Sequence, residues 1–271
     1  MKGNTLKAFS YGGGVQSTAA LVLAAQGTID YQTFLFCNVG ADSENPETLT
    51  YVHEVAQPYA QAHHLNFIEL QKRRRNGEPD SVYGRLTRPG SSSIGIPIRL
   101  ANGAPGNRTC TVDFKIRVVA HWTKQQGATA ETPAVVGLGI SLDEFQRMRS
   151  ESGIPHERLA YPLIDLRLDR ASCIEIIQRA GLPVPPKSSC WFCHFHSLRT
   201  WQTMRHQQPD LFAKAVQLEH LINDKRTQQG RDHVWLTNKL KPLQHVTTDL
   251  VQADLFPREY EETCESGYCM V

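Results

Sequence analysis

Short apolar segments alternate with helix-length segments along this 271-residue chain, and this alternation constrains its fold most strongly. Strands are expected at Leu6–Ser10, Thr33–Asn38, Asn66–Leu70 and Ala134–Gly139. Helices are expected at Gln16–Gln26, Pro46–His63, Lys115–Gln126 and Arg170–Ala180. Strands that alternate with helices are typical of a doubly wound, mostly parallel sheet. The sequence therefore predicts an α/β fold.

Two regions interrupt the alternation. Residues 71–108 are rich in Gly, Pro, Ser and Arg, and a loop of that length is usually functional or disordered. The second region begins at Pro183-Val184-Pro185-Pro186, which no helix can cross, and continues into a cysteine-bearing turn, helical sequence and an irregular tail. We therefore expect an α/β domain at 1–182, with a basic insert at 71–109, and a helical, cysteine-bearing extension at 183–271.

Composition and charge exclude several classes of protein. The chain is 40% apolar and 21% charged, as globular proteins are, and its apolar runs are too short to span a bilayer. Its first residues lack the apolar stretch of a secretory signal, so we expect a cytoplasmic protein without a membrane partner. The net charge of +2 does not by itself indicate a nucleic-acid binder.

Basic residues nevertheless gather in the insert. Lys72-Arg73-Arg74-Arg75 opens a stretch that continues through Arg85, Arg88, Arg99 and Arg108. Such a stretch is either a solvated basic loop or a surface that contacts phosphates.

A glycine run lies between the first strand and the first helix, in the segment Ser10-Tyr11-Gly12-Gly13-Gly14-Val15-Gln16-Ser17-Thr18. Consecutive glycines at such a junction let backbone N–H groups surround an anion, and the helix N-terminus adds its dipole. The segment is neither a Walker A loop nor the dinucleotide-binding Gly-x-Gly-x-x-Gly. A plain glycine turn is the alternative interpretation.

This segment resembles the pyrophosphate-binding loop, Ser-Gly-Gly-x-Asp-Ser, of the adenine-nucleotide alpha-hydrolase (PP-loop ATP pyrophosphatase) superfamily, and within it the phosphoadenosine phosphosulfate (PAPS) reductase family. Gly13, Gly14 and Ser17 match, whereas Gly12 replaces the first serine and Gln16 replaces the aspartate. The resemblance implies a HUP-type fold that binds ATP, PAPS or adenylylsulfate with Mg²⁺. The implied binding residues of this loop are Ser10, Gly12, Gly13, Gly14, Gln16, Ser17 and Thr18.

Two further segments resemble the same family. Asn38-Val39-Gly40, followed by Pro46-Glu47-Thr48, is similar to its Asp-Thr-Gly…Pro-Glu-Thr stretch, which implies that Asn38 and Gly40 bind the nucleotide at the carboxyl edge of the sheet. The stretch from Gly137 to Arg149 is similar to its later Gly-rich, Arg-bearing strand end.

In that later segment the family's arginines meet phosphate or sulfate and its acids can hold a metal. The resemblance implies that Asp143 and Arg147 are catalytic and that Gly139 and Arg149 bind the nucleotide. Ion pairs at i,i+3 and i,i+4 on a solvated helix start, with Glu144 among the acids, are the alternative interpretation.

The seven cysteines fall into two groups. An odd number without an export signal does not favour disulfides. Cys37 and Cys173 lie in apolar stretches and are expected to be buried structural thiols. The other five lie in polar or turn-rich sequence: Cys110, Cys190, Cys193, Cys264 and Cys269.

Cys190-Trp191-Phe192-Cys193 places two thiolates on one turn, as an iron–sulfur cluster or a zinc site requires. Cys110 lies 80 residues before Cys190, in a segment that resembles the Cys-Cys-x-x-x-Lys segment of assimilatory adenylylsulfate reductases, with Thr111 in place of the second cysteine. The resemblance implies that Cys110, Cys190 and Cys193 ligate a 4Fe-4S cluster.

The fourth position of that cluster has two interpretations. Cys264 or Cys269 closes it from the tail, or the fourth iron is open to a substrate sulfur, as in cluster-dependent tRNA thiolases of the superfamily. Zinc is the competing metal, with His194 and His196 as nitrogen ligands.

Three functions follow from these interpretations. The first is an ATP-dependent sulfurtransferase that inserts sulfur into a nucleic acid, by DNA phosphorothioation or base thiolation, with a sulfur donor such as a cysteine desulfurase. The second is a PAPS or adenylylsulfate reductase that uses Cys264 or Cys269 as nucleophile and a thioredoxin-like reductant. The third is a non-catalytic nucleotide or iron–sulfur sensor.

Overall fold

The computed structural model describes residues 5–91 and 94–246, and their contacts divide them into two compact units. Unit 1 comprises residues 5–80 and 111–189. Unit 2 comprises the described residues of 81–110 and 190–246. Most of the insert thus groups with the C-terminal segment, and residues 183–189 group with the α/β unit.

Unit 1 contains a five-stranded sheet in which every neighbouring pair of strands is parallel, in the order β3-β2-β1-β4-β5. This confirms the predicted α/β fold. The strand order reverses between β1 and β4, and open α/β sheets bind ligands beside such a switch point, at the carboxyl ends of the strands. The strands are β1 (Lys7–Tyr11), β2 (Thr33–Asn38), β3 (Asn66–Gln71), β4 (Ala134–Leu138) and β5 (Glu157–Ala160).

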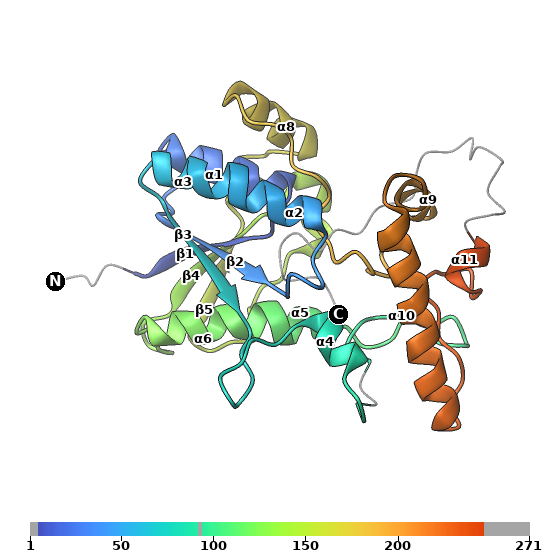
Figure 1. Ribbon diagram of the computed structural model, residues 1–271. Coiled ribbons are helices and arrows are strands. Elements are labelled where there is room, and N and C mark those ends of the chain that lie inside the picture. The colour runs from blue at the N-terminus through green and yellow to red at the C-terminus, as the bar shows by residue number, and fades with distance from the viewer. Residues whose placement is uncertain (1–4, 92–93, 247–271) are drawn as a thin grey trace. The chain divides into compact units, whose positions relative to one another are not determined.

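Helices cover both faces of the sheet because alternate strand residues are apolar on each side (Figure 1). Phe9 and Phe34 pack against the layer that holds α1 and α8, whereas Leu35 and Val136 pack against α6. The helices and helical turns of this unit are α1 (Val15–Ala25), α2 (Pro46–Tyr51), the π-turn η1 (Val52–Ala56), α3 (Gln57–Ala62), the π-turn η2 (Val112–Ile116), α6 (Arg117–Gln125), the 3₁₀ turn η3 (Leu142–Arg147), α7 (Pro162–Asp165) and α8 (Arg170–Arg179).

Unit 2 is helical, and backbone pairing joins its two chain segments. Arg99 and Trp235 exchange two backbone hydrogen bonds of 2.9 and 2.8 Å. The buried Glu219 carboxylate accepts the backbone N–H groups of Leu236 (2.8 Å) and Leu243 (2.7 Å), which holds the residues after α10 against it. The helices here are α4 (Val82–Thr87), α9 (Leu198–Gln207), α10 (Pro209–Gln228) and α11 (Leu243–Val246), and α5 (Thr109–Thr111) spans the boundary with unit 1.

Several elements were not expected from the sequence, among them the short helices α7 and α11. Strand β5 extends the sheet beyond β4, and α4 lies inside the insert that was expected to lack periodic structure. None of the described helices is long and apolar enough to cross a membrane.

Candidate nucleotide-binding site

The glycine run forms the turn between β1 and α1, at the carboxyl edge of the sheet. Gly13 has a φ of +83°, a conformation that favours glycine. A Cβ at Gly13 would lie 2.9 Å from Cγ2 of Thr48 and 3.3 Å from Oγ of Ser188, closer than those side chains could tolerate without moving. Only a glycine fits this position as the chain is folded.

The hydroxyls at the start of α1 shape this turn. Ser17 Oγ donates to the Gly14 carbonyl (3.0 Å) and accepts the Gly14 N–H (3.1 Å), and Thr18 Oγ1 shares a 2.9 Å hydrogen bond with the Tyr11 hydroxyl. Because the first N–H groups of a helix have no partner within it, this end of α1 is suited to an anion. Ser10, at the end of β1, is buried beside it.

The turn after β2 is held by Asn38. Its Oδ1 accepts the Gly40 N–H (2.8 Å), and its Nδ2 donates to Oε1 of Glu69 (2.7 Å). The other oxygen of Glu69 lies 2.9 Å from Nε2 of His53. Asn38 and Gly40 therefore lie at the same sheet edge as the glycine loop, with their polar groups fixed by the turn itself.

The segment after β4 packs directly on the start of α1. A Cβ at Gly139 would lie 3.1 Å from the Ser17 backbone nitrogen, so glycine permits this approach. The buried Gln16 side chain donates to Oγ of Ser141 (3.3 Å) and to Glu144 (3.2 Å) and accepts a hydrogen bond from Arg170 (3.1 Å). Gln16 thus ties α1 to the segment after β4 and to α8.

Asp143 and Arg147, expected to be catalytic, contact other protein groups. Arg147 lies 2.6 Å from Glu144, an i,i+3 ion pair of the kind the alternative interpretation expected, and Asp143 accepts the backbone N–H of Arg170 (3.0 Å). The backbone of Arg149 both donates to and accepts from the Tyr161 hydroxyl at 2.9 Å. Burial raises the pKa of Tyr161, so this hydroxyl keeps its proton for the carbonyl of Arg149.

Three hydroxyl-bearing residues at this edge were not identified from the sequence: Thr48, Ser188 and Ser189. Ser188 Oγ donates to the Gly12 carbonyl, and the Ser189 carbonyl accepts the Asn45 N–H (3.1 Å), which brings residues 183–189 onto the glycine loop. Thr48 belongs to the segment Pro46-Glu47-Thr48, which resembles the family's Pro-Glu-Thr, whereas Ser188 and Ser189 follow a proline run that resembles no binding motif.

Tyr51 binds the other end of residues 183–189. Its hydroxyl donates to the Pro183 carbonyl (2.7 Å), and burial raises its pKa to about 12, although a hydrogen bond with Thr18 acts in the opposite direction. The tyrosine therefore stays protonated as a donor over the physiological pH range.

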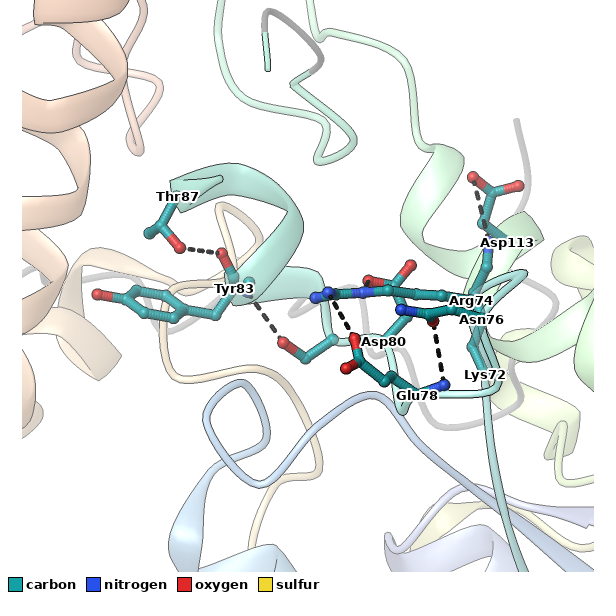
Figure 2. Close-up of polar contacts among 10 residues, drawn as sticks. Lys72, Arg74, Asn76, Glu78, Asp80, Tyr83, Thr87 and Asp113 are labelled. Carbon is teal, nitrogen blue, oxygen red and sulfur yellow. Dashed lines mark hydrogen bonds and ion pairs between the residues drawn. The ribbon is translucent and has the colours of Figure 1, made fainter. Parts of the chain in front are cut away.

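The basic residues Lys72–Arg75 form one side of a short hairpin (Figure 2). Arg74 makes ion pairs with Asp80 (3.3 Å) and Glu78 (3.5 Å), and Lys72 lies 3.9 Å from Asp113. Arg75 is exposed and makes no ion pair within the described part of the chain. Acidic neighbours thus compensate part of the positive charge that the sequence displays.

Cys110, Cys190 and Cys193, the predicted cluster ligands that the structure describes, belong to unit 2 and are half-buried. The Cys193 N–H donates to the Cys190 carbonyl (3.0 Å), which forms the expected turn, and the Cys110 N–H donates to the Gly95 carbonyl (2.7 Å). Across residues 5–91 and 94–246, no three His, Cys, Asp or Glu side chains lie close enough to hold a metal ion. Cys264 and Cys269 lie outside the described residues.

No protein-family model matches this chain, and no curated protein matches it either.

Proposed function

We propose that this chain is an ATP-dependent sulfurtransferase that acts on a nucleic acid, and that unit 1 holds the adenine nucleotide. The observation that carries the proposal is the glycine loop. It joins a strand to a helix at the switch point of a parallel sheet, and Gly13 adopts a left-handed conformation against Thr48 and Ser188. Phosphate groups bind at loops of this kind because backbone N–H groups and the helix dipole converge there.

In the proposed reaction, an oxygen of the acceptor attacks the α-phosphorus of ATP and pyrophosphate leaves. A sulfide sulfur then forms the bond to the activated atom of the acceptor while AMP departs with the acceptor oxygen. If the donor is a persulfide, such as that of a cysteine desulfurase, its outer sulfur forms this bond, and a thiol reductant then cleaves the S–S bond to the donor and is itself oxidised to a disulfide. The loop backbone and the start of α1 would bind the phosphates and stabilise the leaving pyrophosphate. Gln16, buried and bonded to Glu144 and Arg170, would position the segment after β4 beside them.

The proposal of a nucleic-acid acceptor rests on the basic hairpin and on the exposed Arg75 within it. The 4Fe-4S cluster and Mg²⁺ belong to the proposal only as bound groups. The described cysteines do not form a metal-binding group by themselves, so no reaction step passes through the cluster. Asp143 and Glu144 already accept hydrogen bonds, so no step passes through Mg²⁺.

The test compares two glycines that share a backbone conformation. Gly13 and Gly27 have φ values of +83° and +72°, but a Cβ at Gly27 would meet nothing within 4 Å. Both alanine variants carry the conformational cost of about 1–2 kcal/mol, and only Gly13→Ala also intrudes on Thr48. We expect Gly13→Ala to weaken ATP binding at least tenfold, about 1.4 kcal/mol, and Gly27→Ala to leave it unchanged.

Isothermal titration with ATP and with PAPS, followed by an assay for pyrophosphate release in the presence of RNA or DNA, gives the measurement. Pyrophosphate release by the wild-type protein supports the sulfurtransferase. Binding of PAPS without binding of ATP would replace this proposal with the reductase. Absence of binding to both nucleotides would refute the nucleotide site.

A further inference from the structure

Two hydroxyl groups beside the glycine loop are buried without a hydrogen-bond partner. Thr48 is 0% exposed and Ser189 is 5% exposed, and neither Oγ1 of Thr48 nor Oγ of Ser189 has a partner among the described residues. Buried polar atoms are nearly always hydrogen-bonded, because an unsatisfied one destabilises the fold. Two such hydroxyls on segments that contact the same loop therefore point to a ligand.

Both hydroxyls belong to segments that converge on Gly12 and Gly13. Thr48 Cγ2 would lie 2.9 Å from a Cβ on Gly13, and Ser188, the neighbour of Ser189, donates to the Gly12 carbonyl. The hydrogen bond from the Asn45 N–H to the Ser189 carbonyl (3.1 Å) joins the two segments to each other. The start of α2 and residues 183–189 thus stand together against the loop.

We infer that Thr48 and Ser189 donate hydrogen bonds to phosphate oxygens of the nucleotide that the glycine loop binds, so that residues 183–189 form a second wall of the site. Hydroxyl donors match phosphate, which offers only acceptors, and the buried ammonium group of Lys187 adds positive charge to the same segment. This inference rests on the proposed nucleotide site and assigns it two specific ligands.

The test uses Thr48→Val and Ser189→Ala, with Thr50→Val as the matched control because Thr50 is exposed on the same helix, α2. Isothermal titration of the full chain with ATP and with inorganic pyrophosphate measures binding. Because a hydrogen bond to a charged group is at stake, each site variant should bind both probes roughly 10–100-fold more weakly. Thr50→Val should bind both as the wild type does.

The melting temperature of the nucleotide-free protein separates a ligand role from a structural one. Removal of an unsatisfied hydroxyl should leave the melting temperature of Thr48→Val equal to that of the wild type or raise it. A fall of several degrees would overturn the inference, since the hydroxyl would then stabilise the fold itself. Unchanged affinities in both variants, beside a wild type that binds ATP, would overturn the inference alone. A wild type that binds neither probe would refute the nucleotide site and the inference with it.

Discussion

At the scale of residues, the site depends on partners that are far apart in the sequence. The glycine run could be recognised because its three members are consecutive between a strand and a helix. The role of Gln16 could not, because its partners Ser141, Glu144 and Arg170 lie 125 to 154 positions away. Local patterns identify a loop, but only the folded sheet shows which side chains hold it.

Cys37 gives the first residue-scale prediction. Burial raises the pKa of the Cys37 thiol to about 12. Lys115 favours the thiolate and offsets only part of this rise, and Glu44 disfavours the thiolate further. The thiolate is the reactive form, so roughly one molecule in 10⁴ carries it at pH 8. We expect iodoacetamide at pH 8 to leave Cys37 unmodified in the native protein and to modify it after denaturation in guanidinium, as peptide mapping by mass spectrometry would show.

The raised pKa of Cys37 also predicts that the stability of the protein depends on pH. The folded state holds the Cys37 proton more tightly than the unfolded state, so the free energy of unfolding should fall as the pH rises from about 9 towards about 12. Cys37→Ala should remove that part of the slope. Cys37 that is alkylated as fast in the native protein as in the denatured protein would contradict the assignment.

At the scale of elements, segments with a clear apolar pattern were predicted closely, whereas short segments without one were missed. The helix expected at Pro46–His63 is present as α2, η1 and α3 over residues 46–62. Strand β5 has only four residues, Glu157–Ala160, and no apolar run marks it. Its buried Glu157 accepts a hydrogen bond from Thr123 (2.9 Å), a contact that no local pattern encodes.

The basic hairpin supplies the element-scale prediction. If it contacts a nucleic acid, the exposed Arg75 should contribute a full charge, and Arg75→Ala should reduce the salt slope of binding by about 1. Arg179→Ala is the control, because Arg179 is 78% exposed but paired with Glu175 on α8, and its slope should match the wild type. Filter binding over a salt series with RNA and with DNA measures both.

We expect a smaller effect on the salt slope at Arg74. Its charge is compensated by Asp80 and Glu78, so Arg74→Ala should change the salt slope less than Arg75→Ala does. Salt-independent binding by the wild type, or no binding to either nucleic acid, would argue against a nucleic-acid acceptor.

At the scale of the whole molecule, the sheet could be predicted but the grouping of segments could not. Strand and helix periodicities are local, and they gave the α/β fold. The pairing of Arg99 with Trp235 joins residues from either end of the second unit, and nothing in either neighbourhood indicates it. The predicted cysteine site depends on the same long-range grouping, because Cys110 and Cys190 both belong to unit 2.

The cysteine site gives the whole-molecule prediction. Full-length protein purified without oxygen should contain iron and acid-labile sulfide and absorb near ~400 nm. Serine at Cys110, Cys190 or Cys193 should bleach this absorbance because each would supply a cluster ligand, whereas serine at the buried Cys173 should preserve it. Bleaching by Cys264→Ser or Cys269→Ser would make that residue the fourth ligand. Stoichiometric zinc without sulfide would exclude the cluster.

The discontinuity of unit 2 sets an order of events during synthesis on the ribosome. Residues 81–110 leave the ribosome early, but the partners of Arg99 and of the Leu86 carbonyl are Trp235 and Lys225. Trp235 follows Arg99 by 136 residues, which at about 5–20 residues per second takes roughly 7–27 s. Through that interval the first half of this unit lacks these partners, while the last two strands of unit 1, β4 and β5, are synthesised.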